Sequence, residues 1–203
     1  MKRNLTEISQ ELNRQSDWKA LPDLIFITDQ KTQPFPENII ESLPHDSMVI
    51  FRDYDHENRA ELASALRYIC KTKGIKFLVA GDLTLALMVD ADGIHLPEHM
   101  INEAKTIRDA HSDFFITGAC HANTVLEYLP KNELDAVLFA PIFATTSHPE
   151  TLNDPTLTIG SSTLKDICED ISVPVYALGG VNEMTAKQLI GTGVAGIAAI
   201  SGF

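Results

Sequence analysis

Two glycine-rich strand ends near the C-terminus have the composition of a phosphate-binding site. Residues 173–178 form a short apolar run that leads into Gly179 and Gly180, and a stretch with helical spacing follows. Backbone N–H groups at such a strand–glycine–helix junction suit an anion, and the positive end of the helix favours negative charge. A second apolar run ends in Ser201 and Gly202, which would add N–H groups and a hydroxyl. We therefore predict a phosphate site here, although two buried strands with glycine turns and no ligand would show the same pattern.

Arg52 is the cation best placed to hold a further negative group. It ends another apolar run, and its planar set of donors suits a phosphate, pyrophosphate or carboxylate. An internal ion pair would explain the residue equally well, with Asp53, Asp55 or Asp82 as the acid. Tyr54 could stack on a heteroaromatic ring or simply pack. The hydroxyls of Thr145, Thr146 and Ser147 lie in a polar loop that could fold over a ligand or serve only as a linker.

Histidines at strand ends are the candidates for proton transfer. His121 follows one apolar run, His148 lies in the polar loop after the next, and His95 ends the run before them. Imidazole is the side chain that most readily exchanges protons near neutral pH. We predict acid–base roles for His121 and His148, with ordinary hydrogen-bonded histidines as the alternative. All three are expected to face the ligand-binding edge of the sheet.

Eight short apolar runs alternate with stretches of helical spacing, which predicts a repeated strand–helix unit. The runs are continuous, as expected for parallel strands covered on both faces, and they span 24–28, 48–52, 75–79, 92–96, 114–118, 136–139, 173–178 and 196–201. Eight such units close into a (β/α)8 TIM barrel of class α/β more naturally than into an open doubly wound sheet, which stays the alternative. In a barrel, the candidate residues would share the C-terminal mouth, where this fold keeps its sites.

The two ends of the chain predict how the barrel is closed. The sequence stops at Phe203, directly after the eighth predicted strand, so no residues are left for an eighth helix. Asn4 and Glu7 give a capping-box-like start to a helix whose apolar stripe is formed by Leu5, Ile8 and Leu12. We predict an N-terminal helical extension over 1–22 that replaces the missing helix, and one barrel domain over 23–203. An exposed face there could instead form a homodimer interface.

The amino-acid composition limits the classes of molecule that the protein could bind. The chain has 203 residues, 44% of them hydrophobic, and a net charge of −12, which argues against nucleic acid or an anionic membrane as partner. No apolar run is long enough to cross a bilayer and no secretory leader is evident, so a cytoplasmic protein with a small-molecule phosphate ligand is expected. The three cysteines have no paired spacing, which argues against a disulfide framework or a zinc site.

Eight segments between residues 24 and 202 occur in an order and spacing typical of one family. They are ITD at 27–29, VIFR at 49–52, LAL at 85–87, ADGIHL at 91–96, GACH at 118–121, FAPIFAT at 139–145, GG at 179–180 and ISG at 200–202. In this the chain resembles the thiamine phosphate synthase and thiazole tautomerase superfamily of (β/α)8 barrels. Synthases of that family couple a pyrimidine carried on pyrophosphate to a thiazole phosphate through a carbocation-like step. The resemblance implies that the two glycine-rich strand ends hold the thiazole phosphate.

The chain departs from the family's pattern at the residues that bind the pyrophosphate. The Gln-x-Arg-x-Lys cluster of the family corresponds to Ile50, Arg52 and Tyr54, so only the arginine is kept. The lysine of the loop after strand six is also replaced, by His148. The proton-shuttling histidine of the tautomerase branch corresponds to Pro141, so that chemistry would need another histidine.

The family's magnesium ligands are displaced as well. The Asn-Asp pair after strand three corresponds to Ala80 and Gly81, and the acid after strand four corresponds to Met100. Asp82 and Glu98 lie nearby on shifted positions, which leaves open whether Mg²⁺ binds through them. We therefore predict no certain cofactor and assign no metal ligand, and Mg²⁺ stays possible although the family's aligned ligands are absent.

Three functions follow from these residues and this resemblance. We predict first a thiamine phosphate synthase-like protein of thiamine biosynthesis. It would bind a thiazole phosphate or a related phosphorylated heteroaromatic and act as a transferase that couples it to a pyrimidine pyrophosphate. The alternatives are a thiazole tautomerase-like isomerase that uses His121 or His148, and a non-catalytic binder of thiazole phosphate or thiamine phosphate.

Overall fold

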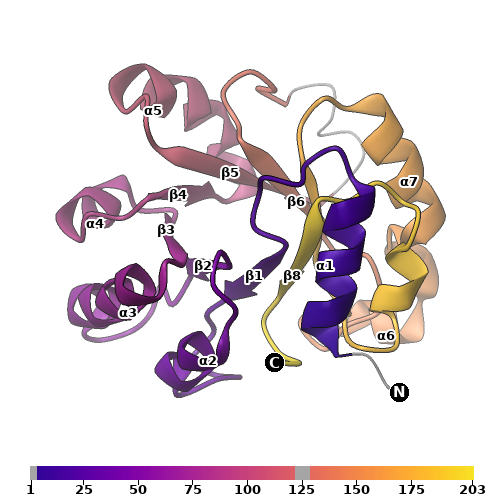
Figure 1. Ribbon diagram of the computed structural model, residues 1–203, viewed down its shortest axis with the longest axis horizontal. Helices are drawn as coiled ribbons and strands as arrows, with labels where there is room; N and C mark the ends of the chain where they lie inside the picture. Colours follow the sequence, from indigo (N-terminus) through magenta and orange to yellow (C-terminus); the bar gives the residue numbers. More distant parts are fainter. Residues whose placement is uncertain (1–3, 122–128) are drawn as a thin grey trace.

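Eight parallel strands close into a barrel in chain order, as the sequence predicts (Figure 1). The computed structural model describes residues 4–121 and 129–203. The strands are β1 (Leu24–Ile27), β2 (Met48–Phe51), β3 (Lys76–Ala80), β4 (Gly93–Leu96), β5 (Phe115–Cys120), β6 (Ala136–Phe139), β7 (Val175–Ala177) and β8 (Gly196–Ala199). Each strand pairs with the next, and β1 pairs with β8 with Leu24 opposite Ile197. The open-sheet alternative is therefore wrong, and the predicted strand ends differ from the observed ones by a few residues.

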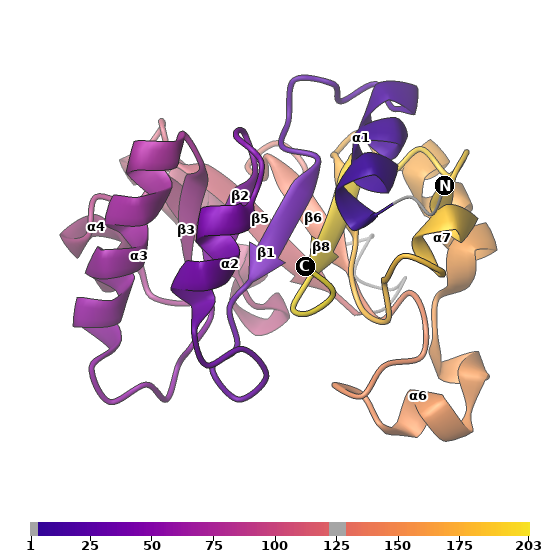
Figure 2. The same cartoon turned by 60° about the horizontal axis from the view of Figure 1, so that its bottom comes forward.

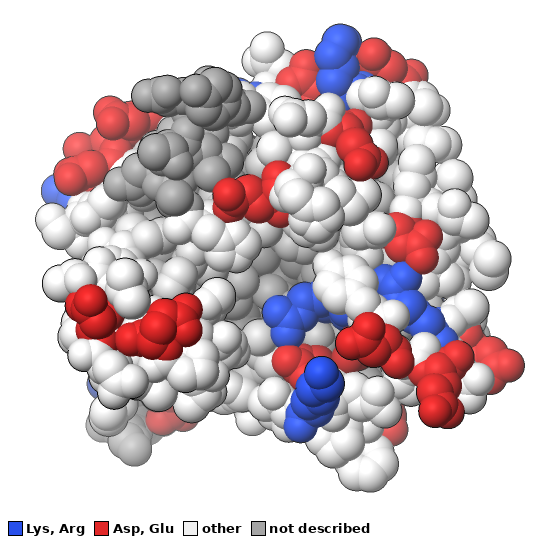
Figure 3. Space-filling view, turned by 180° about the vertical axis from the view of Figure 1, so that it is seen from behind, with Lys and Arg blue, Asp and Glu red and all other residues white. Residues whose placement is uncertain are grey.

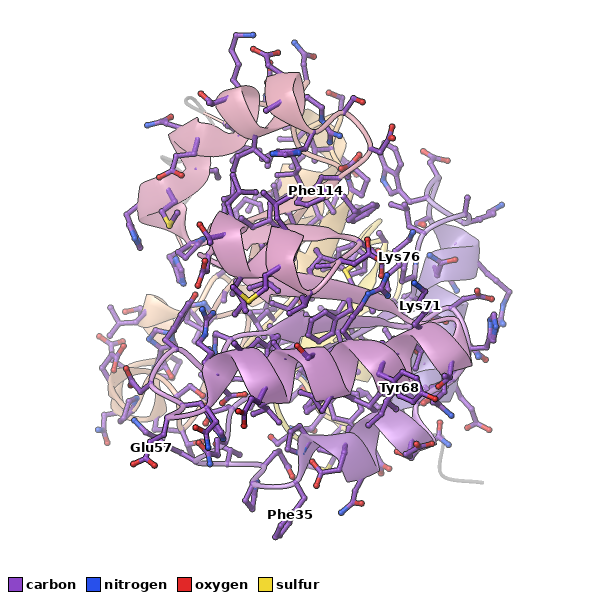
Figure 4. The ribbon with its side chains drawn as sticks, turned by 90° about the vertical axis from the view of Figure 1, so that its left-hand side faces the viewer. Phe35, Glu57, Tyr68, Lys71, Lys76 and Phe114 are labelled. Atoms are coloured by element: carbon purple, nitrogen blue, oxygen red, sulfur yellow. The ribbon has the colours of Figure 1, made fainter. Side chains whose placement is uncertain are left out.

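Helices surround the barrel and explain why its strands are apolar on both faces. They are α2 (Pro36–Ser42), α3 (Arg59–Lys73), α4 (Leu83–Met88), η1 (Glu98–Glu103), α5 (Ala104–Ala110), α6 (Glu150–Asn153), η3 (Pro155–Leu157), α7 (Gly160–Asp170) and η4 (Ala186–Leu189), where η marks a 3-10 helix. Along β1, Leu24 and Phe26 pack in the outer layer between strands and helices, and Ile25 and Ile27 pack inside the barrel. Figure 4 shows the outward side of α3, where Tyr68 and Lys71 are exposed. No helix in the described part of the chain has both the length and the apolar character that a membrane span requires.

Aspartates before two strands stabilise the junctions between helices and strands. Asp92 accepts hydrogen bonds from the Phe77 N–H and from Arg67 of α3. Asp135 accepts bonds from the Ile116 N–H and from Arg108 of α5 in the same way. Each aspartate thus ties a helix and the preceding strand to the start of the following strand.

The helix α1 (Leu5–Gln15) covers the seam between the last strand and the first. It packs against β8, β1 and η4, and Figures 1 and 2 show it alongside β8. The Asn4 side chain accepts a bond from the Glu7 N–H at 2.9 Å, and the Glu7 carboxylate accepts one from the Asn4 N–H at 3.2 Å, so the predicted capping box is present. Asn13 donates to the carbonyl of Ala195 at 2.8 Å, which fastens α1 to the start of β8.

We expect α1 to contribute strongly to stability. Ile8 is fully buried, and replacing a buried isoleucine by alanine removes apolar contacts and leaves a cavity. The Ile8→Ala variant should lose about 3 kcal/mol of unfolding free energy, or roughly 6–12 °C in Tm, as measured by thermal unfolding. Gln10→Ala on the exposed side of the same helix is the control and should leave Tm unchanged. Equal Tm values for the two variants would mean that α1 does not seal the barrel.

The predicted helix after Gly180 differs from the structure. The stretch after Gly180 forms a turn followed only by the four-residue η4, because Asn182 accepts bonds from the N–H groups of Met184 and Thr185 and holds the turn. The prediction of a helix that begins here and presents its positive end to an anion is therefore wrong.

Candidate functional site

A cavity of about 340 Å³ at the C-terminal ends of the strands brings together nearly all the predicted site residues. Its lining includes Arg52, His121, Thr145, Thr146, Ser147, His148, Gly179, Gly180, Ser201 and Gly202. Tyr54 is not among them and lies instead in a neighbouring cavity of about 350 Å³, with Lys31 and His56. Arg52 lines both cavities. On the face opposite to that of Figure 1, the surface is hollowed near its centre, and Lys and Arg lie along one rim among Asp and Glu (Figure 3).

The backbone at the two glycine-rich strand ends forms one wall of the larger cavity. Gly179, Gly180 and Gly202 have φ angles of 89°, 68° and 100°, in the left-handed region that favours glycine. Within residues 4–121 and 129–203, no protein group accepts a hydrogen bond from the N–H of Gly179, Gly180, Ser201 or Gly202. Four N–H donors therefore remain for a ligand at this wall, and a phosphate has the acceptors to use them.

Packing between two loops explains the paired glycines. A Cβ on Gly179 would lie 2.8 Å from the Pro141 Cα, and one on Gly180 would lie 2.5 Å from the Ala144 carbonyl oxygen. The Gly179 carbonyl also accepts a bond from the Phe143 N–H at 3.0 Å. The glycines are thus required where the loop after β7 meets the loop after β6, which fixes the amides relative to the loop hydroxyls.

Arg52 forms an ion pair, but with an acid other than the three predicted. Its Nη2 lies 2.9 Å from Oδ2 of Asp29, in the loop after the neighbouring strand β1. The predicted partners Asp53, Asp55 and Asp82 are therefore wrong. The Arg52 side chain is still 34% exposed, so the guanidinium keeps donors free for a ligand in either cavity.

Arg59 is a second cation of this region that sequence reasoning missed. Its guanidinium donates to Oδ2 of Asp82 at 2.7 Å and to the carbonyls of Asp53 and Ala80, and its side chain is only 16% exposed. It also lies 5.4 Å from the ring centre of Tyr54. The sequence contained a signal, because Arg67 and Arg108 likewise lie in a helix and pair with an aspartate beyond the strand that follows that helix.

The acids near the family's magnesium positions already have other partners. Asp82 accepts bonds from Arg59 and from the Leu85 N–H, where it caps α4. Glu98 accepts two bonds from His121. The described residues contain no cluster of three or more His, Cys, Asp or Glu side chains arranged to hold a metal ion. The residues present therefore do not fit a magnesium ion in the way the family's pattern requires.

His121 and His148 approach one another across the cavity, and each is held by a glutamate. Their ring centres lie 6.3 Å apart with a tilt of 58°. Nδ1 of His121 lies 2.8 Å from Oε2 of Glu98, and Nδ1 of His148 lies 3.1 Å from Oε1 of Glu150. In each ring Nε2 is the nitrogen left for a ligand, so the pair has the geometry of two proton-transfer groups serving one cavity.

His95 lies at the C-terminal end of β4, as expected, but it is buried and lines neither cavity. It is 7% exposed, and its Nδ1 lies 2.9 Å from Oγ1 of Thr117. Burial, together with the nearby charges of Arg52 and His121, lowers the pKa of His95 to about 3. The ring is therefore uncharged near neutral pH.

This buried histidine should make stability depend on pH. Between about pH 6.5 and pH 3 the unfolded chain binds a proton at His95 that the folded protein does not bind, so stability is full above pH 6.5 and falls as the pH is lowered. From pH 7 to pH 5 the loss due to this residue should be about 2 kcal/mol in the free energy of unfolding by urea. His95→Gln should remove that part of the loss, and His99→Gln, at an exposed position, should not.

The loop after β6 contains more structure than its polar sequence predicts. The short helices α6 and η3 form within it, and Figure 2 shows α6 standing away from the barrel. The buried hydroxyl of Thr151 accepts a bond from the Thr145 N–H and donates to the His148 carbonyl at 2.6 Å. These bonds fix the segment that carries the candidate hydroxyls and His148.

Comparison with known proteins agrees with this architecture. The family model described as thiamine monophosphate synthase matches residues 24–203. The chain belongs to this family. It is 35% identical to a putative thiamine-phosphate synthase 2 of Aquifex aeolicus, over 90% of this chain and 98% of the relative. It is 30% identical to a thiamine-phosphate synthase of Pyrococcus furiosus, over 88% of this chain and 84% of the relative.

A solved structure shows the same fold. The thiamine phosphate pyrophosphorylase from Pyrococcus furiosus superposes with a TM-score of 0.71 at 24% identity, over 94% of this chain and 86% of that chain. The resemblance seen in the sequence is thus confirmed, and the chain is a thiamine phosphate synthase-like protein.

Proposed function

We propose that this thiamine phosphate synthase-like protein binds a thiazole phosphate, or a closely related phosphorylated heteroaromatic, and moves a proton on the bound ring. The phosphate would accept hydrogen bonds from the N–H groups of Gly179, Gly180, Ser201 and Gly202. His121 and His148 would serve as base and acid. The observation that carries the proposal is that one cavity holds both the four free amides and the two histidines.

The proton transfer needs no group beyond the ligand and the two imidazoles. Nε2 of one histidine takes a proton from a ring or side-chain carbon, and the electron pair of that C–H bond moves into the conjugated ring. The other histidine, in its protonated form, delivers a proton to a second ligand atom. One histidine ends protonated and the other neutral, and exchange with water restores both.

Coupling to a pyrimidine pyrophosphate is the second candidate function. It is favoured by Arg52, which lines both cavities and so could bind a second anionic group beside the first ligand. The misfit of the magnesium positions weighs against a metal-dependent coupling of the usual kind. A non-catalytic binder of thiazole phosphate or thiamine phosphate would use the same wall without proton transfer.

A binding and exchange experiment separates these functions. Calorimetry with thiazole phosphate, pyrimidine pyrophosphate and thiamine phosphate, each with and without magnesium, should show that thiazole phosphate binds equally well in both conditions. Proton NMR in D₂O should then show that the enzyme accelerates exchange of a carbon-bound hydrogen of thiazole phosphate. Magnesium-dependent formation of thiamine phosphate would favour coupling instead, and tight binding with neither reaction would indicate a binder.

Replacing Arg52 measures its part in anion binding. Because the side chain is one-third exposed and paired with Asp29, the Arg52→Ala variant should weaken binding of pyrimidine pyrophosphate by about 2 kcal/mol, roughly thirtyfold in Kd. Arg52→Lys keeps the charge without the planar pair of donors and should lose less. An unchanged Kd by calorimetry in the alanine variant would mean that Arg52 serves only its ion pair.

Two wider predictions accompany this proposal. We place the protein in the cytoplasm, which cell fractionation tests, and we keep the homodimer as a prediction for sedimentation analysis. We also propose a division of the chain into an N-terminal extension over 1–22 and a barrel over 23–203. The α1 helix of the extension packs directly on β8 of the barrel.

A further inference from the structure

We infer that Glu98 and Glu150 are positioning residues that hold His121 and His148 with Nε2 as the reactive nitrogen in each ring. The inference rests on the proposed function for its effect on catalysis, but the positioning itself is a property of the folded chain. It also gives Glu98 a role other than that of a displaced metal ligand.

The contact between Glu98 and His121 is made by two hydrogen bonds to one oxygen. Oε2 of Glu98 accepts from the backbone N–H of His121 at 2.7 Å and lies 2.8 Å from its Nδ1. An ionised carboxylate can only accept hydrogen bonds, so Nδ1 must carry the hydrogen. Neutral His121 then has its lone pair on Nε2, which is the arrangement a general base needs.

Glu98 is well placed to do this because it belongs to a different part of the barrel. It is the first residue of η1, after β4, whereas His121 directly follows β5. The backbone bond fixes the start of the loop after β5, and the side-chain bond fixes the ring on that loop. The pair therefore sets both the position and the tautomer of His121.

Glu150 repeats the arrangement on the other side of the cavity. Its Oε1 lies 3.1 Å from Nδ1 of His148, and it is the first residue of α6. The two histidines are 6.3 Å apart between ring centres and line the same cavity. With both Nδ1 atoms bound to carboxylates, the two Nε2 atoms remain to serve two different atoms of one ligand.

The test uses three variants of the full chain. Glu98→Ala removes the oxygen that accepts both bonds, Glu98→Gln keeps an acceptor oxygen for them, and Glu103→Gln in the same η1 helix is the matched control at an exposed position. Thermal unfolding first checks that each variant is folded. Nitrogen-15 NMR of histidine-labelled protein then reports which ring nitrogen of neutral His121 carries the hydrogen, and deuterium exchange of thiazole phosphate gives kcat and KM.

We expect the hydrogen on Nδ1 of His121 in the wild type, in Glu98→Gln and in Glu103→Gln, and a shift toward Nε2 in Glu98→Ala. The kcat for exchange should fall about 10–100-fold in Glu98→Ala with little change in KM, and Glu98→Gln should recover most of it. A tautomer that is the same in wild type and Glu98→Ala would overturn the inference, whatever the activity. If the wild type catalyses no exchange but the tautomer responds as expected, the positioning stands and the proposed function fails.

Discussion

Replacing Gly180 by valine is expected to abolish the binding of thiazole phosphate. The new Cβ would lie 2.5 Å from the Ala144 carbonyl oxygen and 2.7 Å from that of Phe143, and its backbone φ of +68° strains any β-branched residue. The loop after β7 or the loop after β6 must then move, and the amides and hydroxyls of the cavity wall move with it. Calorimetry should show affinity reduced by more than about a hundredfold, which corresponds to roughly 3 kcal/mol.

Two further variants separate the clash from the strain. Gly180→Asn tolerates a positive φ but still places a Cβ against the loop after β6, so it should also lose binding. Gly191→Asn has a similar φ of +80° with no atom within 4 Å of the new Cβ, and it should bind thiazole phosphate normally. Retained affinity in a folded Gly180→Val protein would remove this wall from the binding site.

Replacing His121 by alanine is expected to have the second large effect, on rate rather than on binding. A positioned general acid or base contributes about 10²–10⁴-fold to a rate, so exchange of thiazole phosphate hydrogen should slow by that range in His121→Ala. Its Kd for thiazole phosphate should change little, because the phosphate is proposed to bind at backbone amides in the loops after β7 and β8 and not at His121.

The matched control is His99→Ala, an exposed histidine of η1, which should exchange at the wild-type rate. His148→Ala should slow exchange as much as His121→Ala does. If both histidines act in the same proton transfer, the exchange rate of the double variant should be about that of either single variant. Full activity in His121→Ala would exclude it as the base or the acid.

Local sequence patterns were sufficient to predict the barrel. Strands such as β1 and β2 are short and apolar on both faces because one face packs inside the barrel and the other against helices. The capping box of Asn4 and Glu7 is likewise a local pattern, and the structure contains it. The cavity lining followed too, because parallel strands bring all their C-terminal ends to one edge.

The ion-pair and hydrogen-bond partners of residues at the barrel mouth could not be predicted, since they depend on which loops meet around the barrel. Arg52 pairs with Asp29, which lies 23 positions earlier, on the neighbouring loop. The three acids that were predicted as its partners, Asp53, Asp55 and Asp82, do not pair with it. Glu98 is also 23 positions from His121. The stretch after Gly180 was predicted as a helix from its spacing, but Asn182 closes a turn there, so a side-chain hydrogen bond decided the backbone.

The most direct test of the account is a titration of nitrogen-15-labelled protein with thiazole phosphate, followed through the backbone amide signals. We expect the largest shifts at Gly179, Gly180, Ser201 and Gly202, because their N–H groups would donate to the phosphate. Saturable shifts confined to the neighbouring cavity around Lys31 and Tyr54, with these four amides unaffected, would contradict it.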